Sequence, residues 1–471
     1  MKRNIFVLLM DTARADDAYC RETMPSVNRM AEYGTRYANA VSPGTWTAPT
    51  HASLFANLKV SSIKEASQNF FKGGSEIDPW MVRTKFLSRD ASTLAGKLSK
   101  EGYYSVLFSN NPFLTSNTNL AVGFDKIYDI WLESNAKYNR KTVDRVSFVL
   151  NGGASTRSKI FKASYAISKL IPKPALDRIY LNLRVRLDRS VAKADGTHKL
   201  DRGASDTNRL LSKYLKYGYN YAPQFMFINY IEAHENYPVK DKSIVQDKWL
   251  YLSGKEELSD SVKKEFHNAY LRRLRYLDTQ IANTINALKS QGMLDSATVV
   301  ITSDHGQLFG EHGLLYHAMP PYEGLSKVPL ISVNYENGRI VPDNEVVEEP
   351  VSLLSLHSSI LNLAKGKYDR LNGNIRRSKY VMSEHTGISE GWDEHLLSLL
   401  KPKSNTANQI YKAKTKHNKK ATAIYNGKFK LMHFFGNKLD ELYNLEVDPQ
   451  ETSNIIGYNR GIANAMLSAA I

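Results

Sequence analysis

The sequence predicts an α/β fold in which helices cover a large sheet, mixed but mostly parallel, with a small antiparallel subdomain at the C-terminal end. Three observations support this prediction. Short apolar runs alternate with helical patterns along most of the 471 residues, which is typical of parallel sheets. The apolar fraction of 42% can form a large core. Near the end of the chain, Asn426-Gly427 separates two apolar runs, which predicts an antiparallel hairpin.

The expected strands are runs of consecutive apolar or β-branched residues, and the expected helices carry apolar residues three or four positions apart. Val27, Met30 and Ala31 show this helical spacing, and a glycine at position 102 ends the next helix. In chain order, the expected elements are strand 5–10, helix 26–38, helix 92–102, strand 104–108, helix 203–216, strand 224–230, helix 265–290, strands 298–302 and 328–333, and a hairpin of 421–425 with 428–434.

We expect two parts in the chain. Residues 1–394 form the large α/β domain, and residues 395–471 form a small C-terminal subdomain with the antiparallel hairpin. Residues 126–200 show no clear alternation of strand and helix patterns, and they are predicted to be a basic insertion in the first part. The net charge of +16 is concentrated, since residues 137–202 hold 16 Lys and Arg against 5 Asp and Glu, and residues 401–420 add seven lysines.

These basic segments predict an anionic partner, either a glycan or lipid headgroups reached by peripheral membrane contact, with a solvated surface as the alternative. Nucleic acid is not expected, because no recognised nucleic-acid module is present. No apolar run is long enough for a membrane span or a signal peptide, so the cytoplasm is the expected location. The single cysteine, Cys20, excludes an intrachain disulfide. The sequence does not predict the oligomeric state.

Residues that could bind a metal ion follow two predicted strands. Asp11 comes directly after the first strand, at the end where open α/β sheets bind ligands, although an aspartate there is also a common helix cap. Asp304 and His305 follow a β-branched strand, and His312 and His317 come within the next twelve residues. Oxygen and nitrogen ligands together favour Mn²⁺ or Zn²⁺ over Mg²⁺ or Ca²⁺. A capped turn with surface histidines is the structural alternative.

A threonine stands at the predicted start of a helix. Pro49 favours the first helical turn, and Thr47 before it is a natural N-cap. His51 lies one turn further along, on the same helix face. A threonine hydroxyl does not attack unaided at neutral pH, so a nucleophilic role for Thr47 requires a base or a metal ion. Helix cap and nucleophile therefore stay open as alternative roles.

His234 follows the predicted strand 224–230. A histidine at the carboxyl end of a strand can stabilise an anion or protonate a leaving group. A lone histidine at such a position is more often structural. The catalytic role of His234 is therefore considered only together with the other candidate segments.

A rival motif lies near the C-terminal end. Residues 387–391, Gly-Ile-Ser-Glu-Gly, match the nucleophile elbow of serine hydrolases. Only 82 residues remain after Ser389, and much of that stretch has a hairpin pattern. A hydrolase of that type needs substantial sheet after the serine, so we do not favour this interpretation.

Several segments together resemble the sulfatase branch of the alkaline phosphatase superfamily. They are IFVLLMDTARAD, SPGTWTAPTHASLFANL, TLAGKLSKEGYYSVLFSNNPF, FMFINYIEAHENY, VVITSDHGQLFGEHGLLYH and, near the end, ELYNLEVDPQET. They occur in the order of the family and span most of the chain outside residues 126–200 and 236–262. The resemblance implies the large mixed sheet of that superfamily and an enzyme that cleaves sulfuric or phosphoric esters.

The resemblance also implies roles for individual residues. Asp11, Asp304 and His305 would bind one divalent metal ion, and Thr47 would contact the same ion as the nucleophile. A one-metal site is expected because Thr12 stands where two-metal relatives carry a second aspartate. The remaining candidates would contact the substrate or the leaving oxygen: His234 and His317 as catalytic residues, and Asn111, His51 and His312 as substrate-binding residues.

The chain departs from the sulfatases at the nucleophile. Sulfatases carry Cys or Ser in a C-x-P-S-R-like motif that is oxidised to formylglycine, whereas residues 47–51 here read Thr-Ala-Pro-Thr-His. Threonine cannot yield that aldehyde, because its carbinol carbon bears a methyl group, so no formylglycine is expected. The G-K-W-H-L-G segment of many sulfatases is also absent. A metal-bound threonine instead resembles phosphoglycerol transferases of the lipoteichoic acid synthase type and phosphate-ester hydrolases.

We therefore predict a metal-dependent hydrolase that cleaves phosphate monoesters or diesters, or sulfate esters, through a covalent intermediate on Thr47. The alternative is a transferase of the phosphoglycerol or phosphoethanolamine type acting on a glycan or lipid. A second alternative is an inactive protein of the same fold that binds a polyanion. The expected substrate is an anionic ester, with a glycan or a lipid as its candidate carrier.

Overall fold

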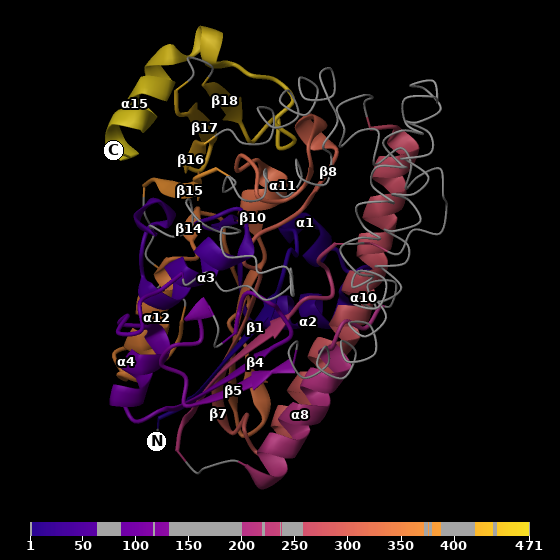
Figure 1. Ribbon diagram of the computed structural model, residues 1–471, viewed down its shortest axis with the longest axis vertical. Coiled ribbons are helices and arrows are strands. Elements are labelled where there is room, and N and C mark those ends of the chain that lie inside the picture. The colour runs from indigo at the N-terminus through magenta and orange to yellow at the C-terminus, as the bar shows by residue number, and fades with distance from the viewer. Residues whose placement is uncertain are drawn as a thin grey trace, which may run out of the picture.

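The computed structural model describes residues 2–63, 86–115, 118–130, 200–218, 222–235, 237, 258–371, 375, 379–387, 420–436 and 440–470. A large mixed sheet runs through the molecule with helices on both sides, and a small antiparallel sheet lies at the end that carries the C-terminus (Figure 1). The predicted fold class is confirmed. Most of the predicted basic insertion and of the lysine-rich segment 401–420 lies outside the described residues.

The central sheet places the first strand of the chain in its middle. In the described residues its strands are β1 (Asn4–Met10), β2 (Thr35–Tyr37), β4 (Tyr104–Ser109), β5 (Lys126–Asp129), β6 (Gln224–Tyr230), β7 (Ser296–Thr302), β11 (Leu330–Glu336), β12 (Arg339–Val341) and β13 (Glu345–Val347). Their order is β13-β2-β11-β7-β1-β6-β4-β5, and β12 pairs with β11. The strands from β7 to β5 are parallel, whereas β11 runs antiparallel to β7 and β2. The sheet is therefore mixed but mostly parallel, as predicted.

Helices cover both faces of this sheet, because alternate strand side chains point to opposite sides. Leu8 of β1 is buried in one core and Leu9 in the other. One core packs against α2 (Pro25–Tyr33), α8 (Ala204–Tyr217) and α10 (Asp260–Ser290), and the other against α3 (Thr47–Ala56), α4 (Leu94–Lys100) and α12 (Ser355–Ala364). Figure 1 shows these two helical layers on either side of the strands. Among the described helices, none is both long enough and apolar enough to span a bilayer.

The first long helix is shorter than predicted. The pattern predicted a helix over 26–38, but α2 ends at Tyr33, and β2 then pairs with β11 and β13. Gly34 permits the close approach at this point, since a Cβ there would lie 2.4 Å from the backbone oxygen of Ser332. The prediction failed because a strand of three residues is too short to show a period of its own.

The shorter elements connect the layers. They are α1 (Ala15–Ala18), β3 (Ala40–Val41), η1 (Val60–Ser62), β8 (Leu308–Phe309), η4 (Glu311–Gly313), β9 (Leu315–Tyr316), α11 (Glu323–Ser326), β10 (Lys327–Val328), β14 (Val351–Ser352) and η5 (Ile456–Tyr458). The strands β10, β3 and β14 form a small sheet, and β8 pairs with β9.

The C-terminal sheet has the order β15-β16-β17-β18 and is antiparallel, with strands β15 (Val381–His385), β16 (Ala421–Tyr425), β17 (Phe429–Phe434) and β18 (Glu441–Asn444). It packs against α15 (Arg460–Ala470), drawn in yellow in Figure 1. The predicted hairpin is confirmed: β16 and β17 pair across Asn426 and Gly427, and the φ of +96° at Gly427 favours glycine.

This arrangement bears on the rival serine motif. β15, the strand before it, is an edge strand of the antiparallel sheet, whereas a nucleophile elbow follows a strand of the main α/β sheet. Ser389 itself and the predicted boundary between residues 394 and 395 lie outside the described residues.

A buried lysine joins the C-terminal sheet to the main domain. Lys430 of β17 is fully buried, and its Nζ lies 2.7 Å from Glu451 Oε1 and 3.0 Å from Glu323 Oε1 of α11. We expect Lys430→Met to lower the free energy of unfolding by about 3–5 kcal/mol, because Glu451 then stays buried without its cation. Denaturant unfolding measures this difference.

Lys428 provides the matched control. Its Nζ lies 2.8 Å from Glu446 Oε2, but both side chains are about half exposed. Lys428→Met should therefore change the free energy of unfolding by less than about 1 kcal/mol. Equal and small effects of the two substitutions would contradict the role given to Lys430.

Candidate active site

Four loops meet at the carboxyl edge of the parallel strands. β7, β1, β6 and β4 are neighbours in the sheet and run in the same direction, so the residues that follow them lie at one edge. Asp304 follows β7, Asp11 follows β1, His234 follows β6, and Asn111 follows β4. Residues from four distant parts of the sequence are thereby brought together.

Thr47 lies beside the acidic part of this group. Its Oγ1 is 3.4 Å from Asp11 Oδ2 and 3.3 Å from His305 Nε2. One ligand atom each from Asp11, Asp304 and His305 lies within 4.8 Å of the other two, and all three side chains are fully buried. Asn111 donates a hydrogen bond from Nδ2 to Asp11 Oδ2. The residues predicted to bind the metal ion and the predicted nucleophile therefore form one group, called the Thr47 cluster below: Asp11, Thr47, Asp304 and His305.

The helix α3 presents Thr47 to this cluster. Thr47 is the first helical residue, and Trp46 occupies the N-cap position without a side-chain hydrogen bond. The alternative prediction, that Thr47 is the N-cap, is therefore wrong. Its hydroxyl faces Asp11 and His305 instead, at the helix end where the macrodipole favours negative charge.

His51 supports Thr47 from within the helix. Its Nδ1–H donates to the backbone oxygen of Thr47 at 2.8 Å, and its ring packs edge-on against Phe55 and Phe227. Burial lowers the pKa of His51, so the ring is neutral at pH 7. These contacts do not support the substrate-binding role that was predicted for His51.

The backbone around Asp304 fixes its carboxylate. Thr12 has a φ of +64°, which is rare for a β-branched residue, and its N–H donates to Asp304 Oδ1 at 3.2 Å. The N–H of His305 donates to the same oxygen at 2.9 Å. Gly306 allows the loop to approach α11, since a Cβ there would lie 2.1 Å from the backbone oxygen of Gly324. Strained backbone held by its surroundings in this way is typical of functional sites.

The charges in the Thr47 cluster fit a bound cation. Burial, together with the neighbouring Asp304, raises the pKa of Asp11 well above its ordinary value. Burial lowers the pKa of His305 to about 4, and its Nδ1–H donates to the oxygen of Gly306, which leaves Nε2 free to act as a ligand. Among the described residues, Asp11 Oδ1 and Asp304 Oδ2 are buried without a hydrogen-bond partner. Two carboxylates, a neutral imidazole and a hydroxyl form a donor set that fits a divalent metal ion.

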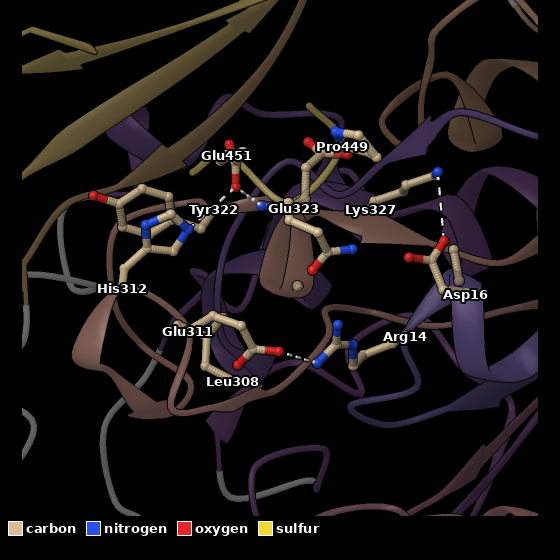
Figure 2. A pocket seen from close by; sticks show the side chains of 13 residues that line it. Arg14, Asp16, Leu308, Glu311, His312, Tyr322, Glu323, Lys327, Pro449 and Glu451 are labelled. Atoms are coloured by element: carbon tan, nitrogen blue, oxygen red, sulfur yellow. Dashed lines mark hydrogen bonds and ion pairs between the residues drawn. The ribbon is translucent and has the colours of Figure 1, made fainter. Parts of the chain in front are cut away.

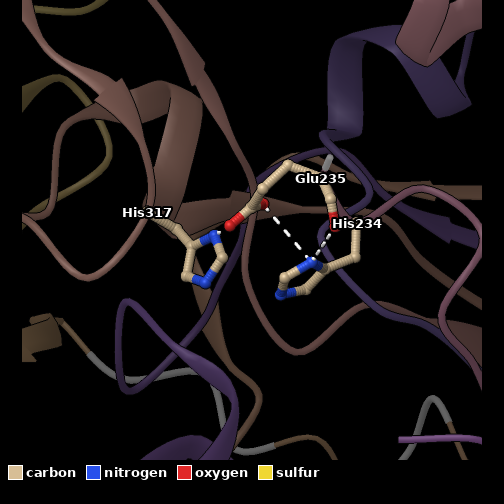
Figure 3. A group of neighbouring side chains, drawn as sticks. All are labelled: His234, Glu235 and His317. Atoms are coloured by element: carbon tan, nitrogen blue, oxygen red, sulfur yellow. Dashed lines mark hydrogen bonds and ion pairs between the residues drawn. The ribbon is translucent and has the colours of Figure 1, made fainter. Parts of the chain in front are cut away.

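A second group lies beside the cluster and contains His234, Glu235 and His317 (Figure 3). The ring centroid of His317 is 4.8 Å from that of His234 and 4.7 Å from that of His305. Burial lowers the pKa of His234 to about 3. Burial acts in the same direction on His317, but the carboxylate of Glu235 outweighs it and raises the pKa of His317. The two histidines predicted to be catalytic are thus neighbours, and His317 lies beside His305 of the Thr47 cluster.

Sequence reasoning missed Glu235, Gln307 and Arg202. Arg202 Nη1 donates to the backbone oxygens of Ile231, His234 and Glu235 at 3.2, 2.8 and 3.0 Å, and so holds the loop after β6. A carboxylate directly after a candidate catalytic histidine is the signal that could have identified Glu235. Nothing in the local sequence marks Arg202, because its contacts exist only in the folded chain.

His312 lies apart from both groups. Its ring stacks on Tyr322, with centroids 3.6 Å apart, and its Nε2 lies 3.7 Å from Glu451 Oε2. These residues line a pocket between the main domain and the C-terminal segment (Figure 2). Many of the charged side chains that line this pocket form ion pairs. Arg14 Nη1, for example, lies 2.6 Å from Glu311 Oε1. The substrate-binding role of His312 therefore stays a prediction, at a pocket separate from the Thr47 cluster.

A family model described as Sulfatase matches residues 3–367. The chain belongs to the sulfatase family. The matched range includes the whole Thr47 cluster and both histidines of the neighbouring group. The family assignment therefore covers every residue around which the candidate active site is built.

The curated sulfatases that resemble this chain are distant relatives. The uncharacterized sulfatase YidJ of Escherichia coli strain K12 is 22% identical over 379 residues, which cover 77% of this chain and 68% of that protein. An extracellular sulfatase SULF-1 homolog of Drosophila melanogaster is 25% identical over 199 residues. That match covers 41% of this chain but only 17% of the Drosophila protein, so the chain spans less than a fifth of its length.

Solved structures of sulfatases and of a phosphonate hydrolase share the fold. A 2-O GAG sulfatase has a TM-score of 0.62 at 15% identity, covering 100% of this chain and 92% of that chain. The phosphonate monoester hydrolase of Agrobacterium radiobacter has a TM-score of 0.60 at 17% identity, covering 100% and 94%. Ps i-CgsB, solved in complex with k-i-k-neocarrahexaose, has a TM-score of 0.53 at 16% identity, covering 100% and 92%. Likeness at these identities establishes a sulfatase-like fold for this family member.

Proposed function

We propose that this sulfatase-family protein hydrolyses phosphate monoesters or diesters through a covalent intermediate on Thr47. The observation that carries the proposal is the position of Thr47 Oγ1, 3.4 Å from Asp11 Oδ2 and 3.3 Å from His305 Nε2. A formylglycine hydrate has a second hydroxyl on the reacting carbon that can expel a bound sulfate. A threonyl ester has none, so the bound group leaves only by attack at its central atom. Metal-assisted displacement at phosphorus is a reaction of this kind, which favours phosphate over sulfate.

The Thr47 cluster supplies the groups that would hold one divalent cation. Asp11, Asp304 and His305 offer ligand atoms close to one another, and Thr47 Oγ1 completes the set. A divalent cation bound at such a site stabilises an alkoxide and neutralises charge on the transferred group. Asn111 keeps Asp11 in place through its hydrogen bond to Oδ2.

The chain's own residues then account for the bonds that change. Thr47 Oγ1 forms a bond to phosphorus while the ester P–O bond opposite to it breaks. The departing oxygen takes its proton from Nε2 of His317 in its protonated form, since Glu235 raises the pKa of His317, whereas burial lowers that of its neighbour His234 to about 3. A water molecule then attacks phosphorus and gives its proton to His317 Nε2. The bond to Thr47 breaks, which leaves Thr47 ionised again, and the phosphate product departs. Attack by a sugar or glycerol hydroxyl in place of water would give the transferase alternative.

A panel of aryl esters tests this proposal. The purified protein is reconstituted separately with Mn²⁺, Zn²⁺, Ca²⁺ or Mg²⁺ and assayed with p-nitrophenyl phosphate, bis(p-nitrophenyl) phosphate and p-nitrophenyl sulfate. We expect a phosphate ester to be cleaved fastest, with Mn²⁺ or Zn²⁺. Faster cleavage of the sulfate would contradict the proposal. With the monoester in the presence of glycerol, release of more nitrophenol than inorganic phosphate would indicate the transferase.

The panel also tests the remaining alternatives. An inactive polyanion-binding protein would turn over none of these esters with any of the metal ions. The carrier of the natural ester stays a prediction, and the oligosaccharide bound to Ps i-CgsB supports a glycan over a lipid as the first carrier to test.

A further inference from the structure

We infer that Glu235 is a positioning residue, which fixes His234 and His317 so that both rings present Nε2 to the transferred group. The inference rests on the proposed function for the identity of the reaction. The positions of the hydrogen atoms on the two rings follow from the hydrogen-bond partners alone, so this part can be tested independently.

The backbone of Glu235 fixes His234. Nδ1 of His234 lies 2.7 Å from the backbone oxygen of Glu235, and a carbonyl oxygen only accepts hydrogen bonds. Nδ1 must therefore carry the hydrogen atom, which leaves Nε2 of the neutral ring free. The same oxygen accepts a hydrogen bond from Arg202 Nη1 at 3.0 Å, and Arg273 Nη1 donates to the oxygen of His234. Arg202 thus holds the peptide oxygen that orients the ring, and Arg273 holds the preceding one.

The side chain of Glu235 fixes His317, both directly and through Gln307. Nδ1 of His317 lies 3.2 Å from Glu235 Oε2 and 3.0 Å from Gln307 Oε1. Gln307 Nε2 donates to Glu235 Oε2 at 3.1 Å, and an ionised carboxylate accepts only. The carboxylate therefore sets which end of the Gln307 amide faces it, and the amide oxygen is turned toward His317. Both neighbours of Nδ1 are acceptors, so Nδ1 carries the hydrogen atom here as well.

With Nδ1 occupied, Nε2 is the atom through which each ring exchanges a proton with the site: it donates from the protonated ring and accepts in the neutral ring. The rings of His234 and His317 lie beside each other (Figure 3). The ring of His317 also lies beside that of His305 in the Thr47 cluster. A separate metal ion held by His234, Glu235 and His317 is the competing interpretation. It is disfavoured because Nδ1 of His234, the atom nearest to Glu235, is already committed to a carbonyl oxygen at 2.7 Å.

Two variants separate the side-chain effect from a general disturbance. Glu235→Leu keeps a similar size and removes both acceptors, whereas Glu235→Gln keeps one carbonyl acceptor. We expect Glu235→Leu to lower kcat for the preferred ester by about 10- to 100-fold, the usual effect of losing a group that orients a histidine. KM should change less than kcat, and Glu235→Gln should recover part of the loss. Circular dichroism and the midpoint of thermal unfolding show whether each variant is folded.

A spectroscopic readout tests the orientation itself. Protein with ¹⁵N-labelled histidine is studied by NMR at alkaline pH, where the rings are neutral, and His234→Asn and His317→Asn assign the two sets of signals. In the wild type, both rings should be the Nδ1–H tautomer. In Glu235→Leu, His317 should become a mixture of tautomers while His234, which is fixed by the backbone, should stay unchanged.

Three outcomes would overturn the inference. The first is an Nε2–H tautomer for either ring in the wild type. The second is an unchanged kcat and an unchanged His317 tautomer in Glu235→Leu. The third is a second equivalent of Mn²⁺ or Zn²⁺ in the wild type that Glu235→Leu removes, since the three side chains would then be a metal site. A wild type that cleaves no phosphate ester would contradict the proposed function instead, and would leave the tautomer result unaffected.

Discussion

Replacing Thr47 by valine is expected to lower kcat for the preferred ester by a factor on the order of 10⁴ to 10⁶, as the removal of a hydrolase nucleophile or its partners does. Valine has the shape of threonine and removes only the hydroxyl that faces Asp11 and His305. Steady-state kinetics with the aryl ester measures the change. Single-turnover experiments under acid quench should show a phosphorylated chain for the wild type and none for Thr47→Val.

Two further variants make this result specific. Thr47→Ser keeps a hydroxyl at the same position and should retain measurable turnover. Thr50→Val changes a buried threonine of the same helix to which no role is given, and it should retain the activity of the wild type. Removing a nucleophile lowers kcat far more than about tenfold. If Thr47→Val lowers kcat by less than about tenfold, the attacking group lies elsewhere.

Asp11→Asn is expected to abolish both metal binding and turnover. The wild type should retain about one Mn²⁺ or Zn²⁺ per chain after dialysis, and the variant close to none, because a neutral amide replaces an anionic ligand in a site where ligands must be deprotonated. Metal content is measured by elemental analysis, and activity by the same aryl ester assay. A variant that keeps its metal ion and its activity would contradict the assignment of the Thr47 cluster.

The thermal stability of the metal-free protein provides an independent check, because Asp11→Asn should not lower it even though the substitution abolishes metal binding. Burial and the nearby Asp304 raise the pKa of Asp11, so its charge is unfavourable in the folded state unless a cation is present. After chelation, Asp11→Asn should therefore unfold at the same temperature as the wild type or at a higher one. Added metal ion should raise the unfolding temperature of the wild type only. A chelated variant that unfolds well below the chelated wild type would show that the substitution acts through misfolding.

The positions of the strand-end residues were predictable, because they depend on the direction of the strands and not on individual side-chain contacts. Asp11, His234 and Asp304 each follow an apolar strand, and the carboxyl ends of parallel strands share one edge. The alternation of strands and helices therefore predicted the shared edge, whereas the strand order that makes β7, β1 and β6 neighbours came from the structure. The hairpin around Gly427 was predictable for a local reason, namely the conformational preference of glycine.

Other features could not be predicted, because tertiary contacts decide them. Residues 35–37 were included in the predicted helix 26–38, but pairing with β11 makes them a strand. Thr47 reads as a helix cap, yet the cap position falls on Trp46. The roles inferred for Glu235 and Gln307 depend on which loops meet after β6 and β7, and no spacing in the sequence encodes that meeting.

The central place of β1 has a consequence for synthesis of the chain. β1 leaves the ribosome well before its partners β6 and β7, which begin only at Gln224 and Ser296. At about 5–20 residues per second, the strand waits roughly 10–40 s for the first partner. During that time an apolar run with unpaired backbone is exposed, which is a hazard for aggregation. We expect nascent chains that end before residue 224 to depend on chaperones, and chains that extend beyond the second partner to become resistant to protease.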